Sequence, residues 1–137
     1  MENRFHISLP CMHIEATEKF YTQILGAAKG RSAKNWVDIN LFDHQLTFTK
    51  SGKFKFDYPS YTFENTVLPS FHFGILLPDS TWNTLYKKMH AENFLYIDKT
   101  SFLTGSKGAH KSFFLRDPNG YIIEFKCFKD AGAVFEV

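Results

Sequence analysis

The sequence predicts an α+β fold built from two repeated modules. Phe5-His6 recurs as Phe71-His72, 66 residues later, and each pair opens a short apolar strand. Each strand is followed by a helical pattern and then by strand-like runs, and at the same offset Phe20 falls on Tyr86, both on apolar helix faces. Each half therefore reads as strand, helix and strands, which indicates internal duplication and two packed modules that share one sheet-lined groove.

The first module is expected over residues 4–50. An apolar strand over 4–9 is followed by Pro10, which is expected to stop it. The apolar positions of 16–25 repeat with helical spacing, and Gly26 follows at the place of a left-handed cap. The runs 36–39 and 45–48 alternate like half-buried strands, with a turn at Asp43-His44 between them.

The second module is expected over 70–128. A strand over 71–76 ends before Pro78, and Asp79 or Ser80 is expected to cap the helix that follows. Two strands, 112–115 and 121–128, are joined by Asp-Pro-Asn-Gly at 117–120, which is a strong hairpin signal.

The modules are joined by a linker, 51–69, and followed by a tail, 129–137. A loop as long as this linker is usually functional or mobile. It carries five aromatic residues, which line a substrate mouth in one interpretation and pack outside the sheet or at a dimer interface in the other: Phe54, Phe56, Tyr58, Tyr61 and Phe63.

Length and composition favour one globular domain, 1–137. The chain has 137 residues, 44% of them hydrophobic and 22% charged, with a net charge of only +2. That charge gives no footprint for nucleic acid, and no apolar stretch is long enough to cross a membrane. Two cysteines, no disulfide framework and no signal-peptide pattern favour a reduced, cytoplasmic protein.

Three residues are candidate metal ligands. His6 and His72 occupy the same place in the two modules, and Glu124 is a carboxylate inside an apolar strand, where it needs a partner or a metal. Two imidazoles and one carboxylate form the triad of non-haem Fe(II) oxygenases, and Mn, Zn or Ni also suit such ligands. In the alternative interpretation, each histidine is a half-buried structural residue and Glu124 pairs with a basic neighbour.

The residues also resemble the vicinal oxygen chelate superfamily, which includes glyoxalase I, extradiol dioxygenases, and fosfomycin- and bleomycin-resistance proteins. The resemblance covers about 4–128. It rests on Phe-Tyr-x-x-Ile-Leu-Gly at 20–26 and on Asp-Pro-Asn-Gly-x-x-x-Glu at 117–124, with the two Phe-His pairs. It implies paired βαβββ modules in a U-shaped mixed sheet around a central groove, one divalent metal with Fe(II) favoured, and a homodimer. His6, His72 and Glu124 match ligand positions, whereas Gln45 lies where glyoxalase I-like members place a glutamate.

The leading hypothesis is a dioxygenase-like metalloenzyme that chelates neighbouring oxygens of a small, possibly aromatic substrate. His44 and His110 are candidate acid–base residues, because an imidazole titrates near neutrality. The candidate substrate contacts are Gln45, Tyr58, Phe114 and Tyr121. Phe114 replaces the tyrosine that ring-cleaving relatives carry three residues before Asp-Pro. A glyoxalase-type lyase or isomerase and a metal-free, drug-sequestering protein remain the alternatives.

Overall fold

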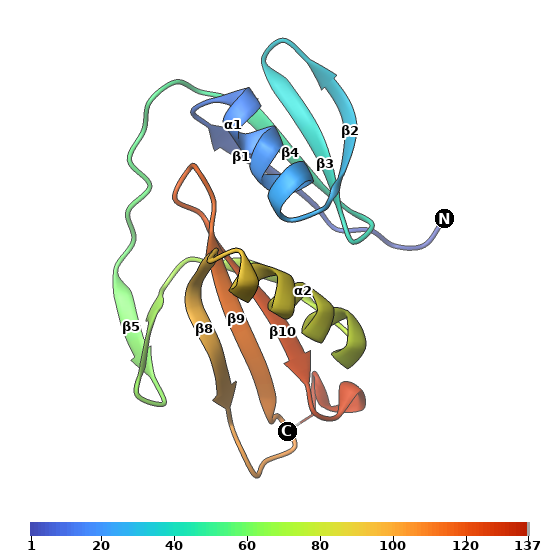
Figure 1. The fold of residues 1–137 in the computed structure, drawn as a ribbon, viewed down its shortest axis with the longest axis vertical. Coiled ribbons are helices and arrows are strands. Elements are labelled where there is room, and N and C mark those ends of the chain that lie inside the picture. The colour runs from blue at the N-terminus through green and yellow to red at the C-terminus, as the bar shows by residue number, and fades with distance from the viewer. Residues whose placement is uncertain (137) are drawn as a thin grey trace. The chain divides into compact units, whose positions relative to one another are not determined.

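The chain forms two compact units, shown in a computed structural model that describes residues 1–136 (Figure 1). Unit 1 comprises Met1–Phe56 together with Asp117–Gly120, and unit 2 contains the rest of the described chain. Each unit contains one copy of the predicted strand–helix–strands repeat, so the α+β class and the paired βαβββ modules are confirmed.

Unit 1 contains a four-stranded sheet in the order β1-β4-β3-β2, in which β1 runs parallel to β4 and the other neighbours are antiparallel. Helix α1 contacts β3 and β4 and covers one face of this sheet (Figure 1), burying Val37, Ile39 and Phe48. The opposite face of the sheet carries the polar residues that alternate with these apolar ones along the strands. The elements are β1 (His6–Cys11), α1 (Ile14–Lys19), a π-helical turn η1 (Phe20–Ile24), β2 (Ala28–Ala33), β3 (Trp36–Leu41) and β4 (His44–Lys50).

Unit 2 repeats this arrangement with the sheet order β7-β10-β9-β8, where β7 runs parallel to β10. Helix α2 lies on one face, and the indole nitrogen of its buried Trp82 donates a hydrogen bond of 2.8 Å to the Phe125 carbonyl oxygen. The elements are a hairpin of β5 (Ser60–Phe63) and β6 (Thr66–Pro69), then β7 (Phe73–Leu76), α2 (Asp79–Ala91), β8 (Leu95–Phe102), β9 (His110–Arg116), β10 (Ile122–Phe128) and η2 (Ala131–Ala133).

Several expected boundaries in unit 1 are wrong. Strand β1 continues through Pro10 because β1 is an edge strand paired only with β4, so the missing N–H of proline costs no ladder bond there. The α-helix ends at Lys19 and continues as the π turn, although Gly26 has the expected positive φ of 82°. The tight turn is formed by Phe42 and Asp43, both at positive φ, one residue earlier than expected.

Unit 2 also departs from expectation. The linker is not structureless, because β5 and β6 form a hairpin whose turn is at Glu64-Asn65. His72 lies just before β7 rather than inside it, and Asp79 is the first residue of α2 rather than its cap. The tail contains the short helix η2. Its final residue, 137, lies outside the described residues. No helix of residues 1–136 combines the length and apolar character needed to cross a membrane.

The turn between β9 and β10 is held inside unit 1 by buried polar contacts. The Tyr21 hydroxyl donates to Asp117 Oδ2 at 2.9 Å. The Asn119 amide oxygen accepts from the Met12 N–H at 2.9 Å, and its nitrogen donates to Thr17 Oγ1 at 3.1 Å. The Asp-Pro-Asn-Gly motif therefore does more than reverse the chain, because it satisfies groups at the start of the first module's helix.

Replacing Asn119 with alanine is expected to lower the free energy of unfolding by about 2 kcal/mol, because the Met12 N–H and the Thr17 hydroxyl lose their partner in a largely buried place. Urea denaturation of the two proteins measures the difference. Lys87→Ala, an exposed change on α2, is the control and is expected to stay within about 0.5 kcal/mol of the parent. An equal loss in both variants would contradict the role of the turn.

Candidate functional site

In unit 2, His72 and Glu124 are brought together by the parallel pairing of β7 and β10. Glu124 lies opposite Gly74, and the His72 Nε2 atom lies 3.3 Å from Glu124 Oε1. The His72 Nδ1–H donates to the Pro69 carbonyl oxygen at 3.1 Å, which fixes the ring and turns Nε2 toward the carboxylate. The ring also packs edge-on against Phe114, with 5.7 Å between centroids. Two of the three predicted ligands therefore meet in one unit.

The Glu124 carboxylate is 8% exposed and is held on both oxygens. Its Oε2 accepts a hydrogen bond of 2.6 Å from the Ser112 hydroxyl, and Lys126 Nζ lies 3.6 Å from Oε1. Burial alone would raise the pKa of Glu124, but the hydrogen bonds from His72 and Ser112 and the charge of Lys126 outweigh it and lower the pKa. The hydrogen bond to Glu124 raises the pKa of His72 against the opposing effect of burial.

The chemistry of this pair fits two ligands of a divalent metal ion. Metal-binding histidines generally donate their second ring N–H to a carbonyl or carboxylate, and metal-binding carboxylates are themselves hydrogen-bonded. His72 has such a partner in Pro69, and Glu124 has one in Ser112. Neither unit, over residues 1–136, gathers three or more His, Cys, Asp or Glu side chains close enough to hold a metal by itself. Within the described part of unit 2, the pair therefore offers two candidate ligands, fewer than a metal site needs.

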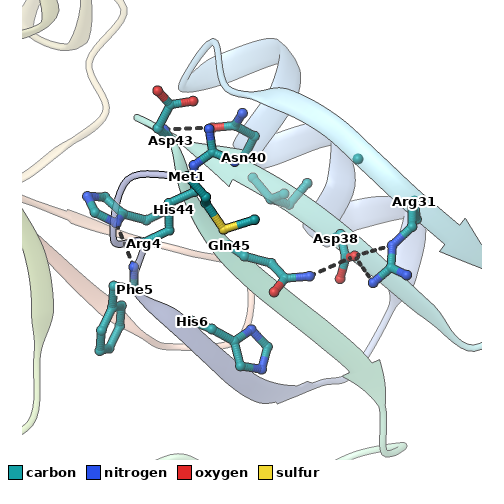
Figure 2. A pocket seen from close by; sticks show the side chains of 12 residues that line it. Met1, Arg4, Phe5, His6, Arg31, Asp38, Asn40, Asp43, His44 and Gln45 are labelled. Atoms are coloured by element: carbon teal, nitrogen blue, oxygen red, sulfur yellow. Dashed lines mark hydrogen bonds and ion pairs between the residues drawn. The ribbon is translucent and has the colours of Figure 1, made fainter.

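In unit 1, the exposed His6 lines a hollow of about 390 Å³ on the polar face of the sheet. His6 lies at the start of β1, directly opposite Gln45 on β4. Figure 2 shows both side chains in this hollow together with Asp38 and Arg31. The hollow is the place of the third predicted ligand.

A buried carboxylate, Asp38, organises the floor of this hollow. Its Oδ1 accepts from the Thr47 hydroxyl at 2.6 Å, and its Oδ2 accepts from Gln45 Nε2 at 3.1 Å and from Arg31 Nε and Nη2, both at 3.2 Å (Figure 2). Burial would raise the pKa of Asp38, but these hydrogen bonds outweigh it and hold the pKa below its usual value. Because the Gln45 nitrogen is engaged with Asp38, the carbonyl oxygen of that amide remains available as an acceptor.

The register of the strands corrects the expected counterpart of Glu124 in the first module. Ser8 of β1 lies opposite Thr47, and Gly74 of β7 lies opposite Glu124. Ser8 and Gly74 are related by the same offset of 66 residues as the two Phe-His pairs. Thr47 rather than Gln45 therefore occupies the position in the first module that is equivalent to Glu124.

The two candidate acid–base histidines lie in different units. His44 lines the unit 1 hollow, and its Nδ1 accepts the Phe5 N–H at 3.0 Å. His110 donates from Nδ1 to the Gly108 carbonyl oxygen at 2.8 Å and lines a second hollow, which also contains His72 and Glu124. His110 is thus the candidate that lies beside His72 and Glu124, the candidate ligands of its own unit.

The candidate substrate contacts have varied surroundings. Gln45 lines the unit 1 hollow. Tyr58 is 55% exposed and stacks on Phe71, away from the residues that line either hollow. Phe114 and Tyr121 are fully buried, and Phe114 lies opposite Glu124 on β9 and packs in the core. Phe114 therefore supports the His72 ring from the core.

Sequence reasoning missed three polar residues that line these hollows or hold a side chain that does. Asp38 stands inside an apolar strand as Glu124 does, so the argument that selected Glu124 would also have selected Asp38. Lys126 and Ser112 are recognisable only from the strand register. Lys126 lies two residues after Glu124 on β10, and Ser112 lies opposite Lys126 on β9.

The sequence matches no protein-family model and no curated protein. Among solved structures, a glyoxalase/bleomycin resistance protein/dioxygenase from Alicyclobacillus acidocaldarius is 25% identical, with a TM-score of 0.82 over 97% of this chain and 96% of that one. The fosfomycin resistance protein FosX from Listeria monocytogenes is 11% identical, with a TM-score of 0.67 over 97% and 98% of the two chains. Lactoylglutathione lyase from Agrobacterium tumefaciens is 12% identical, with a TM-score of 0.64 over 100% and 98%.

These neighbours are vicinal oxygen chelate proteins, and they share the βαβββ repeat described above over nearly their full lengths. The resemblance that the Phe-His pairs and the Asp-Pro-Asn-Gly motif predicted is therefore confirmed, and this chain has the fold of the vicinal oxygen chelate superfamily.

Proposed function

We propose that the protein is a metalloenzyme that binds neighbouring oxygens of a small substrate at a divalent ion, with Fe(II) favoured. His72, Glu124 and His6 are its proposed ligands. The observation that carries the proposal is the contact of 3.3 Å between His72 Nε2 and Glu124 Oε1, with each group oriented by its own partner. The resemblance to the superfamily supports the same ligand positions.

When bound, such an ion polarises substrate oxygens as a Lewis acid, and iron adds chemistry with O₂. The protein's own residues supply the rest. Pro69 and Ser112 hold the two ligands in fixed orientations, and the Phe114 ring supports His72. His110, with its Nδ1 engaged by a carbonyl, presents its other ring nitrogen as the group that exchanges a proton with substrate. Dioxygenase-like chemistry is the proposed activity.

A metal-free binding protein is the second candidate, and one observation favours it. Lys126 lies 3.6 Å from Glu124 Oε1, so a resident ammonium already balances the buried carboxylate. Lyase chemistry of the glyoxalase kind is less well supported, because the first module offers Thr47 and Gln45 at the relevant strand, and neither is a base.

The test is metal binding by the purified full chain. Protein prepared anaerobically without chelator is expected to contain about one Fe or Mn per chain by elemental analysis. His72→Ala and Glu124→Gln are expected to weaken metal binding in calorimetric titration by more than the roughly 10- to 100-fold that loss of a supporting residue costs. His6→Ala tests the third ligand in the same way.

His13→Ala is the matched control, because His13 is exposed and its side chain makes no capping hydrogen bond to α1. This variant is expected to keep the parent affinity. A parent protein that neither contains nor takes up metal would refute the metalloenzyme and leave the binding protein. Parent affinity in His6→Ala alone would remove only His6 from the ligand set.

A further inference from the structure

The second hollow, inside unit 2, has the size of a single aromatic ring. Its volume is about 170 Å³, and it lies beside the His72–Glu124 pair. An apolar cavity of about 150 Å³ is known to bind benzene. Apolar side chains form most of its walls: Tyr61 and Phe63 of the β5–β6 hairpin, Leu68 and Phe102. The hollow therefore has room for one six-membered ring.

The walls of this hollow also have the geometry that binds a ring. Phe63 lies 5.6 Å from Phe102 between centroids, and Phe102 lies 5.4 Å from His110. His110 in turn lies 5.1 Å from Phe128. Tilted aromatic contacts at such distances are favourable, and a ligand ring placed against these side chains extends the series.

One cation, Lys126, enters this largely apolar hollow. Its Nζ lies 3.6 Å from Glu124 Oε1, which is longer than an ordinary hydrogen bond, and 5.9 Å from the centre of the Phe128 ring. An ammonium has three donors. Lys126 therefore still has N–H donors for a ligand. Its positive charge is balanced only by the Glu124 carboxylate, which His72 also contacts.

Metal binding changes this balance of charge. His72 Nε2 and Lys126 Nζ both approach the same oxygen of Glu124. If Glu124 held a divalent ion, its single negative charge would have to balance both the ion and the Lys126 ammonium. Lys126 would then be a half-buried positive charge without a full partner, which is costly. An anionic group on the ligand would restore the balance.

We propose that this hollow binds a single-ring aromatic carboxylate, with the ring against the side chains of Phe63, Phe102 and His110 and the carboxylate on Lys126. The inference deepens the proposed function, since it names the substrate class of the same site. The expectation that metal binding favours the ligand rests on the proposed function, but the contact between Lys126 and the ligand carboxylate does not.

Benzoate is the probe for the metal-loaded protein, with binding followed by ligand-observed NMR and calorimetry. Lys126→Met, which keeps the apolar stem, is expected to weaken benzoate binding at least tenfold and to leave metal binding at the parent level or tighter. Lys129→Met removes an exposed lysine three residues along and is expected to change affinity less than twofold. Benzamide, the neutral isostere, is expected to bind the unaltered protein at least tenfold more weakly than benzoate.

A metal-free arm separates this inference from the metalloenzyme proposal. Glu124→Gln removes the carboxylate that Lys126 shares, so chelator-treated Glu124→Gln is expected to bind benzoate more tightly than the chelator-treated parent. Adding Lys126→Met is expected to abolish that gain. If the parent binds no metal but this arm behaves as stated, the metalloenzyme is refuted and the carboxylate site stands. Equal binding of benzoate and benzamide, or no effect of Lys126→Met in either arm, would overturn the carboxylate site.

Discussion

Replacing Gly74 with alanine is expected to destabilise the protein by about 3 kcal/mol and to disrupt the contact between His72 and Glu124, the candidate metal ligands. A Cβ added at Gly74 would lie 2.0 Å from the Glu124 carbonyl oxygen and 3.0 Å from the Glu124 Cβ. The nearest atoms belong to the backbone of β10, so relief requires β7 to move away from β10. That movement would separate His72 from Glu124. Chemical denaturation measures the first effect, and metal titration measures the second.

Gly108→Ala is the control for the Gly74 variant. The nearest atom to a Cβ at Gly108 is the end of the Leu103 side chain, at 3.4 Å, which is ordinary van der Waals contact. This control is expected to stay within about 0.5 kcal/mol of the parent and to keep its metal affinity. A Gly74→Ala protein with parent stability and parent metal affinity would show that the two strands are not held as closely as described.

The second large effect is expected at Asp38. Asp38→Ala leaves the hydroxyl of Thr47, the amide of Gln45 and the guanidinium of Arg31 without their common acceptor. Loss of one member of a buried ionic group costs about 3–5 kcal/mol. Here Arg31 is 78% exposed and is solvated, so the low end, about 3 kcal/mol, is expected for the free energy of unfolding.

Asp38→Asn tests the charge of this group through pH. Since the folded state lowers the pKa of Asp38, the ionised carboxylate stabilises the fold above the unfolded pKa of about 3.9, and this stability is lost as the pH falls through the lower, folded value. The asparagine variant lacks this contribution. It is therefore expected to be less stable than the parent at pH 7, with a gap that closes as the pH falls below about 4.

Asp43→Asn makes the same change of charge at an exposed turn residue whose positive φ of 69° asparagine tolerates. Its stability is expected to follow the parent from pH 7 to pH 3. A constant gap between parent and Asp38→Asn over that range would instead assign the effect of Asp38 to shape rather than to charge.

The repeat made most of the fold predictable. Phe-His at an offset of 66 residues and the apolar helix faces located both modules, because burial of one face imposes a period that the sequence must carry. Strand β2 was not predicted because all six of its residues are exposed, so no apolar period marks it. The linker hairpin was not predicted for a similar reason, since β5 is exposed along its whole length.

The site was less predictable than the fold. Glu124 could be selected because an ionisable side chain in an apolar run must find a partner. Lys126 gave no such signal, because a half-buried lysine in a strand is ordinary, and its approach to Glu124 depends on how both side chains lie on one strand. The equivalence of Thr47 and Glu124 also required strand register, since a shift of two residues along β4 keeps the same face and leaves the apolar pattern unchanged.

The Asp117–Gly120 turn determines where the chain can be cut into fragments that fold. The chain passes from unit 1 to unit 2 near residue 57, returns at 117, and leaves again after 120. A fragment that stops at Phe56 lacks the acceptors that Tyr21 and the Met12 N–H use, although it contains every strand of its own sheet. The first module is therefore not an independent folding unit on its own stretch of sequence. Its buried polar groups are satisfied only when four residues from the later part of the chain, Asp117–Gly120, are present.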